Sequence, residues 1–172
     1  MDIEIIRGDI TKKAADAIVN AANTSLLGGG GVDGAIHRAT GSALLAECRT
    51  LGGCKTGQVK ITKGYNLPAK CVIHTPGPVW QGCNYGEPEL LRSCYERCLE
   101  PGVKYSCATM AFPSVSTGIY GYPEGKASLI AMETMKNFDD PGGVIKKVAI
   151  ICFDLKTKEA YDAAAEAVLT RQ

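Results

Sequence analysis

A run of four consecutive glycines, Gly28–Gly31, constrains this 172-residue chain more than any other stretch. It follows an apolar segment, Ala17–Val19, that is typical of a buried strand, and it precedes a helical pattern that opens with Val32 and Asp33. Residues without a Cβ let the backbone approach a ligand closely and adopt positive φ. The helix start beyond them offers unpaired N–H groups and the positive end of its dipole. The stretch therefore predicts a site for a phosphorylated ligand, with a carboxylate beside it.

Length and charge narrow the class of protein. A chain of 172 residues can bury a sizeable core in one domain, and we assign residues 1–172 to a single domain. Lys and Arg number 19 against 18 Asp and Glu, so the basic excess of a nucleic-acid-binding protein is missing. The N-terminus lacks a signal-peptide pattern, and no apolar run approaches the ~20 residues of a membrane span. We expect a cytoplasmic protein with no nucleic-acid or membrane partner.

Eight cysteines are scattered through the chain without a CxxC pair, and only two histidines, His37 and His74, accompany them. Zinc sites need Cys and His ligands at short spacings, which these residues do not provide. A chain of this size without a secretion signal does not depend on disulfides. The sequence therefore predicts reduced thiols, no bound metal and no cofactor.

Strand-like and helix-like patterns largely alternate along the chain. This order predicts an α/β fold, a three-layer α/β/α sandwich around a mixed, mostly parallel sheet. We expect strands at residues 3–6, 16–19, 58–63, 71–74, 109–112 and 148–153, and helices at residues 34–49, 88–100, 123–138 and 157–170. The loops 20–33 and 114–121 each follow the carboxyl end of an apolar strand, where open α/β sheets bind ligands. Both loops could therefore reach one ligand.

The glycine run also contains the spacing G-x-G-x-x-G at residues 29–34, which invites a dehydrogenase interpretation. In dinucleotide-binding proteins the strand leads directly into the glycines, whereas here residues 23–27 intervene. The acidic residue expected about 20 residues later is also missing, because that region contains Gly53-Cys54-Lys55-Thr56. The context therefore argues against hydride transfer.

Single residues in these loops also have purely structural interpretations. Asp33 could cap its helix, Asn23 could be a turn residue, and Asn20 could satisfy loop backbone groups. His37, one helical turn after Asp33, is more typical of a structural partner than of a base. His74, on an apolar strand, is typical of a core histidine with satisfied hydrogen bonds.

Four motifs taken together are more specific. They are GDIT at residues 8–11, DAIVNAAN at residues 16–23, GGGGVDGAIHRATG at residues 28–41 and FPSVSTGIYGYP at residues 112–123. In sequence, order and spacing they resemble a macrodomain of the hydrolytic MacroD-type branch, over essentially the whole chain. The resemblance implies a site for ADP-ribose.

The resemblance implies binding roles at both ends of this ligand. Asp9 would accept a hydrogen bond from the adenine amino group, with the Ile10 backbone beside it, and Phe153 would pack against the ring. Backbone groups of the two loops would surround the pyrophosphate and the distal ribose without Lys or Arg. The residues implied in the loops are Asn20, Gly30, Gly31, Val32, Ser116, Thr117, Gly118, Ile119 and Tyr120, the last packing on the ribose.

The resemblance also implies catalytic roles for Asn23 and Asp33. Asn23 would orient the hydroxyls of the distal ribose, and Asp33 would activate or position a water that cleaves an ester there. The implied activities are deacetylation of O-acetyl-ADP-ribose and removal of mono-ADP-ribose from Asp and Glu side chains, so the expected partners are ADP-ribose, its esters and mono-ADP-ribosylated proteins. The alternative is a reader that binds ADP-ribose without catalysis, but a reader needs neither Asn23 nor Asp33.

Overall fold

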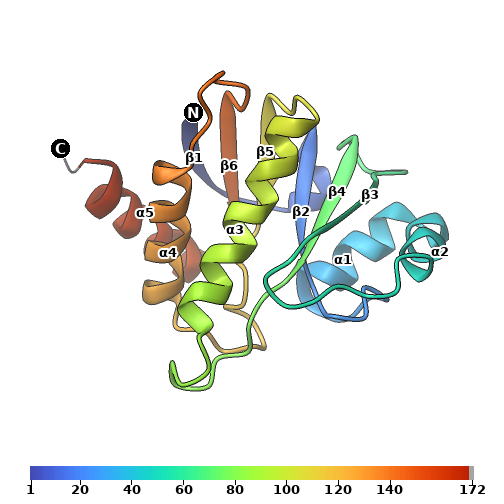
Figure 1. Ribbon diagram of the computed structural model, residues 1–172, viewed down its shortest axis with the longest axis horizontal. Helices are drawn as coiled ribbons and strands as arrows, with labels where there is room; N and C mark the ends of the chain where they lie inside the picture. The colour runs from blue at the N-terminus through green and yellow to red at the C-terminus, as the bar shows by residue number, and fades with distance from the viewer. Residues whose placement is uncertain (171–172) are drawn as a thin grey trace.

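The computed structural model describes residues 1–170, which form a six-stranded sheet flanked by helices (Figure 1). The strands are β1 (Asp2–Arg7), β2 (Ala17–Ala22), β3 (Lys60–Lys63), β4 (Cys71–Pro76), β5 (Thr109–Phe112) and β6 (Lys147–Cys152). Their order in the sheet is β1-β6-β5-β2-β4-β3. All neighbours pair in parallel except β3 and β4, which are antiparallel. The predicted mixed, mostly parallel sheet is confirmed.

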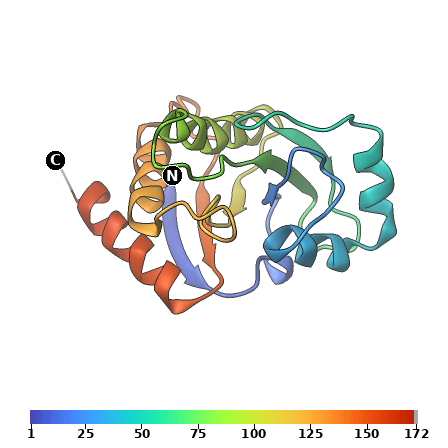
Figure 2. The ribbon, with the colours of Figure 1, turned by 90° about the horizontal axis from the view of Figure 1, so that it is seen from below.

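Helices cover both faces of the sheet, as the views along and across it show (Figures 1 and 2). They are η1 (Ile10–Lys12, a 3-10 helix), α1 (Gly31–Thr40), α2 (Ser42–Arg49), α3 (Glu87–Lys104), α4 (Glu124–Asn137) and α5 (Leu155–Leu169). Buried residues of α3, α4 and α5 form one apolar cluster with the sheet, and those of η1, α1 and α2 form a second. The three-layer α/β/α sandwich is therefore confirmed.

The central strands contribute to both clusters because successive side chains of a strand point to opposite faces. In β6, Val148 and Ile150 belong to the cluster beneath α3, α4 and α5, while Ala149 and Ile151 belong to the cluster beneath α1 and α2. A strand covered on both faces has little room for polar residues. This accounts for the continuous apolar run in its sequence.

Several element boundaries differ from the sequence-based expectation, and three of the differences have a clear cause or consequence. The expected helix 34–49 is two helices, because Gly41 between them adopts φ 82° and ψ −175°, which no helix contains. The strand expected at residues 16–19 continues to Ala22, so Asn20 lies inside β2 and not in the following loop. Helix α3 does not stop at the expected residue 100 but passes through Pro101 to Lys104. Pro101 is buried, and the packing of this last turn offsets the hydrogen bond that proline cannot donate.

The cysteines serve as packing residues. All eight are free thiols, and most are buried. Burial raises the pKa of both Cys48 and Cys94 to about 11, so these thiols stay protonated and unreactive near neutral pH. Across residues 1–170, no helix is long and apolar enough to cross a membrane.

Candidate active site

The two predicted ligand loops leave the same edge of the sheet. Strands β2 and β5 are parallel neighbours, so the loop 23–30 before α1 and the loop 113–123 before α4 leave this edge from adjacent strands, although β2 extends further than β5. Figure 2 looks onto this edge, with α1 in blue and the loop after β5 in yellow-orange. The edge therefore brings together the loops on which the predicted site depends.

Asn23 supports the glycine loop from within. Its Oδ1 accepts hydrogen bonds from the Ser25 N–H, at 3.2 Å, and from the Leu26 N–H, at 3.1 Å, and its Nδ2 donates to the Gly28 carbonyl at 2.8 Å. Leu26 is fully buried at φ 62° and anchors the loop in the core. The turn interpretation of Asn23 is thus correct, but these contacts leave one hydrogen-bond donor of the side chain unused. An amide has two N–H groups, so the second remains for a ligand.

Asn23 and Asp33 approach each other across Gly29. A Cβ on Gly29 would lie 3.2 Å from Asp33 Oδ2 and 3.3 Å from Asn23 Nδ2, so only glycine leaves both side chains undisturbed. The capping interpretation of Asp33 is wrong, because the N-cap of α1 is Gly30 and no side chain caps this helix. Instead, Asp33 lies in the first turn with only 4% of its surface exposed. The two residues implied as catalytic therefore form one polar centre.

A buried polar network lies behind Asp33. Asn20 Nδ2 donates to Asp33 Oδ1 at 2.9 Å and contacts His74 Nδ1 at 3.1 Å, while His74 Nε2 lies 2.8 Å from Thr62 Oγ1. Asn20 and His74 are fully buried and pair in register across β2 and β4. The expectation of a satisfied core histidine is confirmed. Asn20 is placed to act on a ligand through Asp33, because it has no exposed surface of its own.

His37 lies beside Asp33, in the position of the structural partner that the sequence analysis expected. Its Nε2 lies 3.4 Å from Asp33 Oδ1, which is close enough for electrostatic attraction, although the geometry makes no hydrogen bond. A Cβ on Gly28 would lie 3.7 Å from the same ring, so His37 also borders the glycine loop. The spacing of four residues between Asp33 and His37 places them on one helix face. The spacing used in the sequence analysis therefore agrees with the observed geometry.

Burial controls the ionisation of Asp33. Removal from water raises the pKa of its carboxyl, while the Asn20 hydrogen bond and, to a smaller degree, the charge of His37 lower it. A carboxylate with a raised pKa is a better proton acceptor than an exposed one. The arrangement therefore suits a general base or a residue that holds a water.

His74 makes the stability of the fold depend on pH. Burial lowers the pKa of His74 from 6.5 to about 4, so the unfolded chain binds a proton at a higher pH than the folded chain does. Above pH 6.5 His74 is neutral in both the folded and the unfolded chain, so it does not change the free energy of unfolding. As the pH drops from 6.5 toward 4, only the unfolded chain takes up the proton, and the stability of the fold falls. We expect a loss of about 3 kcal/mol in the free energy of unfolding at the lower limit.

Urea unfolding at about pH 7 and about pH 4.5, compared between the wild type and His74→Asn, measures this effect. Asparagine does not titrate, so the variant should lose much less stability on acidification. Asp33 acts in the opposite sense, since its raised pKa favours the folded state at low pH, and it is present in both proteins. Equal losses in the two proteins would show that His74 is not the group responsible.

Both loops carry main-chain N–H groups that are left without a hydrogen-bond partner in the described chain. Within residues 1–170, no hydrogen bond engages the amides of residues 31–33 at the start of α1 or those of residues 116–120 after β5. A Cβ on Gly30, Gly31 or Gly118 would meet nothing within 4 Å. Clustered free amides and a helix start bind anions without side-chain charge. The sequence-based prediction assigns phosphate contacts to Gly30, Gly31, Val32 and residues 116–119, which lie in or beside these two sets of amides.

The second loop carries two further features. Ser116 is buried and adopts φ 68°, a left-handed backbone conformation that turns the chain just before the amides of residues 117–120. Ile119 is fully exposed at the tip, and Tyr120 is half-buried, with its carbonyl accepting a hydrogen bond from the Trp80 N–H at 2.9 Å. The backbone of the loop is therefore tied to the segment after β4.

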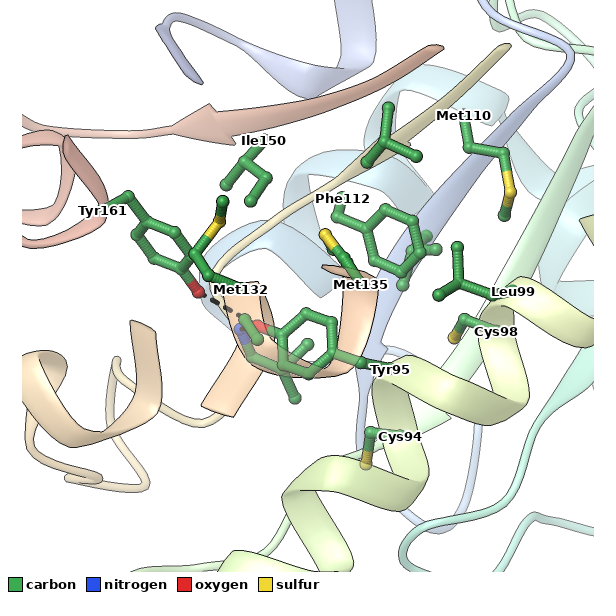
Figure 3. Close-up of a cluster of buried hydrophobic side chains, with 14 of the residues drawn as sticks. Cys94, Tyr95, Cys98, Leu99, Met110, Phe112, Met132, Met135, Ile150 and Tyr161 are labelled. Atoms are coloured by element: carbon green, nitrogen blue, oxygen red, sulfur yellow. Dashed lines mark hydrogen bonds between the residues drawn. The ribbon is translucent and has the colours of Figure 1, made fainter. Parts of the chain in front are cut away.

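Two buried tyrosines hold this loop from the core side (Figure 3). Tyr95 on α3 accepts a hydrogen bond from the Val115 N–H at 3.0 Å, and Tyr161 on α5 donates to Ser114 Oγ at 3.1 Å. The two phenol oxygens lie 3.0 Å apart. Burial raises the pKa of Tyr161 to about 12, so this pair remains neutral. Sequence analysis missed both residues, because tyrosines on the apolar faces of helices carry no sign of the loop that they contact.

The residues implied for adenine lie at the other end of the edge. The Gly8 N–H donates to the Cys152 carbonyl at 2.9 Å, so Asp9 and Phe153 follow neighbouring strands. Asp9 Oδ1 accepts from the Thr11 N–H at 2.9 Å, and this contact and the Thr11 hydroxyl lower the pKa of Asp9. Its second oxygen remains for an amine. Phe153 is 88% exposed, and the Ile10 side chain is buried, so only the Ile10 backbone can face a ligand.

Comparison with known proteins gives a consistent result. The sequence model of one family, described as Macro domain, matches residues 19–131. A macro domain-containing protein of Chlorobaculum tepidum is 58% identical over 96% of both chains. O-acetyl-ADP-ribose deacetylase 1 of Pantoea vagans is 47% identical over 92% of this chain and 95% of its own. ADP-ribose glycohydrolase MACROD2 of Xenopus laevis is 58% identical over 79% of this chain and 33% of its own.

Solved structures agree with these sequences. The Oceanobacillus iheyensis macrodomain with ADP is similar at a TM-score of 0.92 and 40% identity, over 97% of this chain and 91% of that chain. The Trypanosoma brucei macrodomain in complex with ADP-ribose is similar at a TM-score of 0.88 and 46% identity, over 95% of this chain and 68% of that chain. Sequence and fold therefore point to the same family.

Proposed function

The chain belongs to the macrodomain family, with relatives in its MacroD-type branch, and from this premise we propose that it is an ADP-ribosyl ester hydrolase. Its substrates are O-acetyl-ADP-ribose and proteins that carry mono-ADP-ribose on Asp or Glu side chains. Similarity to a deacetylase and to an ADP-ribose glycohydrolase supports this activity. Similarity to macrodomains that hold ADP and ADP-ribose supports the ligand.

One observation carries the proposal: a buried carboxylate, Asp33, lies in the first turn of α1, at one of two sets of main-chain amides that make no hydrogen bond in the described chain. The amides of residues 31–33 and 116–120 bind the pyrophosphate and the distal phosphate-linked ribose from two sides. Asp9 and Phe153 hold the adenine at the far end of the same edge. A ligand held in this order would have its distal ribose, and any ester on it, next to Asp33.

In this mechanism Asp33 accepts a proton from a water, or holds that water, as it attacks the ester. The bond between the acyl carbon and the ribose oxygen breaks, and the ribose oxygen takes a proton from Asp33 or from solvent and leaves as a hydroxyl. The acyl group is released as a carboxylate, whose proton passes to solvent. Asn23 uses its free N–H to orient the ribose hydroxyls, while its other contacts keep the glycine loop in place. An ester is reactive enough that one carboxylate and a held water suffice.

We propose that residues 1–172 act as one macrodomain in the cytoplasm, with ADP-ribosylated proteins as partners. A reducing compartment agrees with the eight free thiols. Nucleic acid is not proposed as a partner, because the net charge of +1 offers no basic surface for a phosphate backbone.

The proposal is tested by turnover of O-acetyl-ADP-ribose beside a protein mono-ADP-ribosylated on Glu. Calorimetry with ADP-ribose on the same preparation measures binding separately. Release of ADP-ribose from either substrate supports an esterase, and the ratio of the two rates identifies the preferred substrate. Tight binding with no turnover of either would instead identify a reader.

We expect Asp9→Ala to weaken binding of ADP-ribose by about tenfold, since a buried hydrogen bond to a charged acceptor is worth roughly 1.5–3 kcal/mol and this one is partly exposed. The measurement compares ADP-ribose with its hypoxanthine analogue, which lacks the exocyclic amine. The wild type should prefer ADP-ribose, and the variant should lose that preference. Asp162→Ala, an exposed carboxylate on α5, is the control. Unchanged affinity and preference in Asp9→Ala would remove Asp9 from the site.

A further inference from the structure

We propose that His74 is a positioning residue for Asp33: it fixes the orientation of the Asn20 amide and so keeps an N–H donor on the catalytic carboxylate. His74 is fully buried in β4 and touches no ligand. The kinetic measurement below rests on the proposed function, whereas the titration of Asp33 does not. The role assigned to His74 is to keep the Asn20 N–H donor directed at the Asp33 carboxylate.

The hydrogen bonds of the network define the tautomer of His74. We assign the tautomer in which Thr62 Oγ1 donates its hydrogen to the Lys63 carbonyl at 3.2 Å and accepts from His74 Nε2–H at 2.8 Å, because Asn20 Nδ2 then finds an acceptor at Nδ1. The neutral ring then has no hydrogen on Nδ1, which becomes an acceptor. Asn20 Nδ2, 3.1 Å away, is the donor that this atom requires.

The same acceptor forces the Asn20 amide into one orientation. In the observed orientation its two N–H groups serve His74 Nδ1 at 3.1 Å and Asp33 Oδ1 at 2.9 Å. A rotated amide would place Oδ1 against a lone pair on the histidine or against the carboxylate, and both contacts are repulsive. The cost of the observed orientation is visible, because Asn20 Oδ1 is buried without a hydrogen-bond partner in the described chain. A buried polar atom left unsatisfied is unfavourable by itself, so the two donated bonds must outweigh it.

Few other groups act on this carboxylate. The titratable groups that face Asp33 or His74 are His37 on α1 and Glu47 and Cys48 on α2. Burial keeps the Cys48 thiol neutral by raising its pKa to about 11, and Glu47 bonds the Tyr65 hydroxyl at 2.6 Å. Asn20 is the largest influence that lowers the pKa of Asp33. Loss of the histidine acceptor should therefore raise the pKa of Asp33.

The test compares His74→Leu with His74→Asn. Leucine removes the acceptor, whereas the asparagine Oδ1 can occupy the place of Nδ1 and accept from Asn20. Ile73→Val is the control for general core damage, because it alters the neighbouring buried residue of β4 that faces the opposite cluster. For each protein, the titration of Asp33 is followed by carbon NMR of its carboxyl group, and hydrolysis of O-acetyl-ADP-ribose is measured across pH.

We expect the Asp33 titration and the acidic limb of kcat in His74→Leu to move up by about one pH unit, with roughly tenfold lower kcat on that limb. ADP-ribose affinity should change less than about twofold. His74→Asn should restore most of the wild-type profile, and Ile73→Val should match the wild type. In an Asn20→Ala background, His74→Leu should add no further shift.

An Asp33 titration that stays in place in a folded His74→Leu protein would overturn the proposal. So would equal shifts in His74→Leu and Ile73→Val, which would indicate general damage to the core. If the wild type fails to hydrolyse the ester, the proposed function fails, but the NMR titration still decides the role of His74. The two failures are therefore distinguishable.

Discussion

Asp33→Ala should abolish turnover while it leaves ADP-ribose binding nearly intact. The carboxylate contributes no donor to the phosphates, so we expect affinity to stay within about tenfold, ~1.4 kcal/mol. Hydrolysis of O-acetyl-ADP-ribose should fall by several orders of magnitude, because Asp33 is the only carboxylate of the described chain that lies near Gly29 together with Asn23. Calorimetry and a turnover assay on the same protein measure the two effects.

Asp33→Asn refines the test, because asparagine keeps the size of the side chain but cannot take a proton. It should be as inactive as Asp33→Ala if Asp33 is a base, and partly active if Asp33 only holds the water. Asp162→Ala serves as the control, since this carboxylate lies exposed beside Lys158. Turnover of Asp33→Ala at the wild-type rate would refute the catalytic assignment.

Gly34→Ala should damage both stability and ligand binding, which is the reverse of the usual effect of alanine in a helix. Within a helix, alanine is normally more stable than glycine by about 1 kcal/mol. At Gly34, however, the new Cβ would collide with the Gly29 carbonyl oxygen and press on Arg38. We expect a loss of roughly 1–3 kcal/mol in the free energy of unfolding, as for an overpacked core. ADP-ribose affinity should fall more than tenfold (about 1.4 kcal/mol or more), because the glycine loop must shift.

Gly125→Ala provides the matched control. Gly125 also lies in the first turn of a helix, α4, and a Cβ there would meet nothing within 4 Å. This variant should gain stability and bind ADP-ribose as the wild type does. Urea unfolding and calorimetry compare the two variants, and a similar gain in stability for both would refute the close packing inferred at Gly34.

The sequence predicted the layers of this fold, and each of the boundaries discussed above that it missed has a physical cause. Alternating strand and helix patterns depend on burial, which residue type reveals directly. The break at Gly41 was invisible because glycine also occurs within helices, and the pattern on both sides continues. The extension of α3 through Pro101 required knowledge of the packing around the last turn, which lies outside the local sequence.

Residues of the candidate site that belong to a sequence motif could be named from the sequence, but the residues that support them from other elements could not. The glycines and Asp33 stand out because their types are unusual at that spacing. The partners behind them are found only by folding: Asn20 meets His74 through the register of β2 with β4, across more than fifty residues. Tyr95 and Tyr161 likewise reach the loop after β5 from helices distant in sequence. Contacts of this kind leave no trace in a local pattern.

The free amides of the two loops also affect how this site can change over time. A donor that belongs to the main chain survives every side-chain replacement except proline, provided that the turns at Gly31, with φ 58°, and at Ser116, with φ 68°, are retained. An exposed position such as Ile119 can therefore vary and recruit different protein surfaces, while the proposed main-chain contacts to the diphosphate are kept. Exposed side chains that contact a protein target can therefore evolve separately from the main-chain amides proposed to bind the nucleotide.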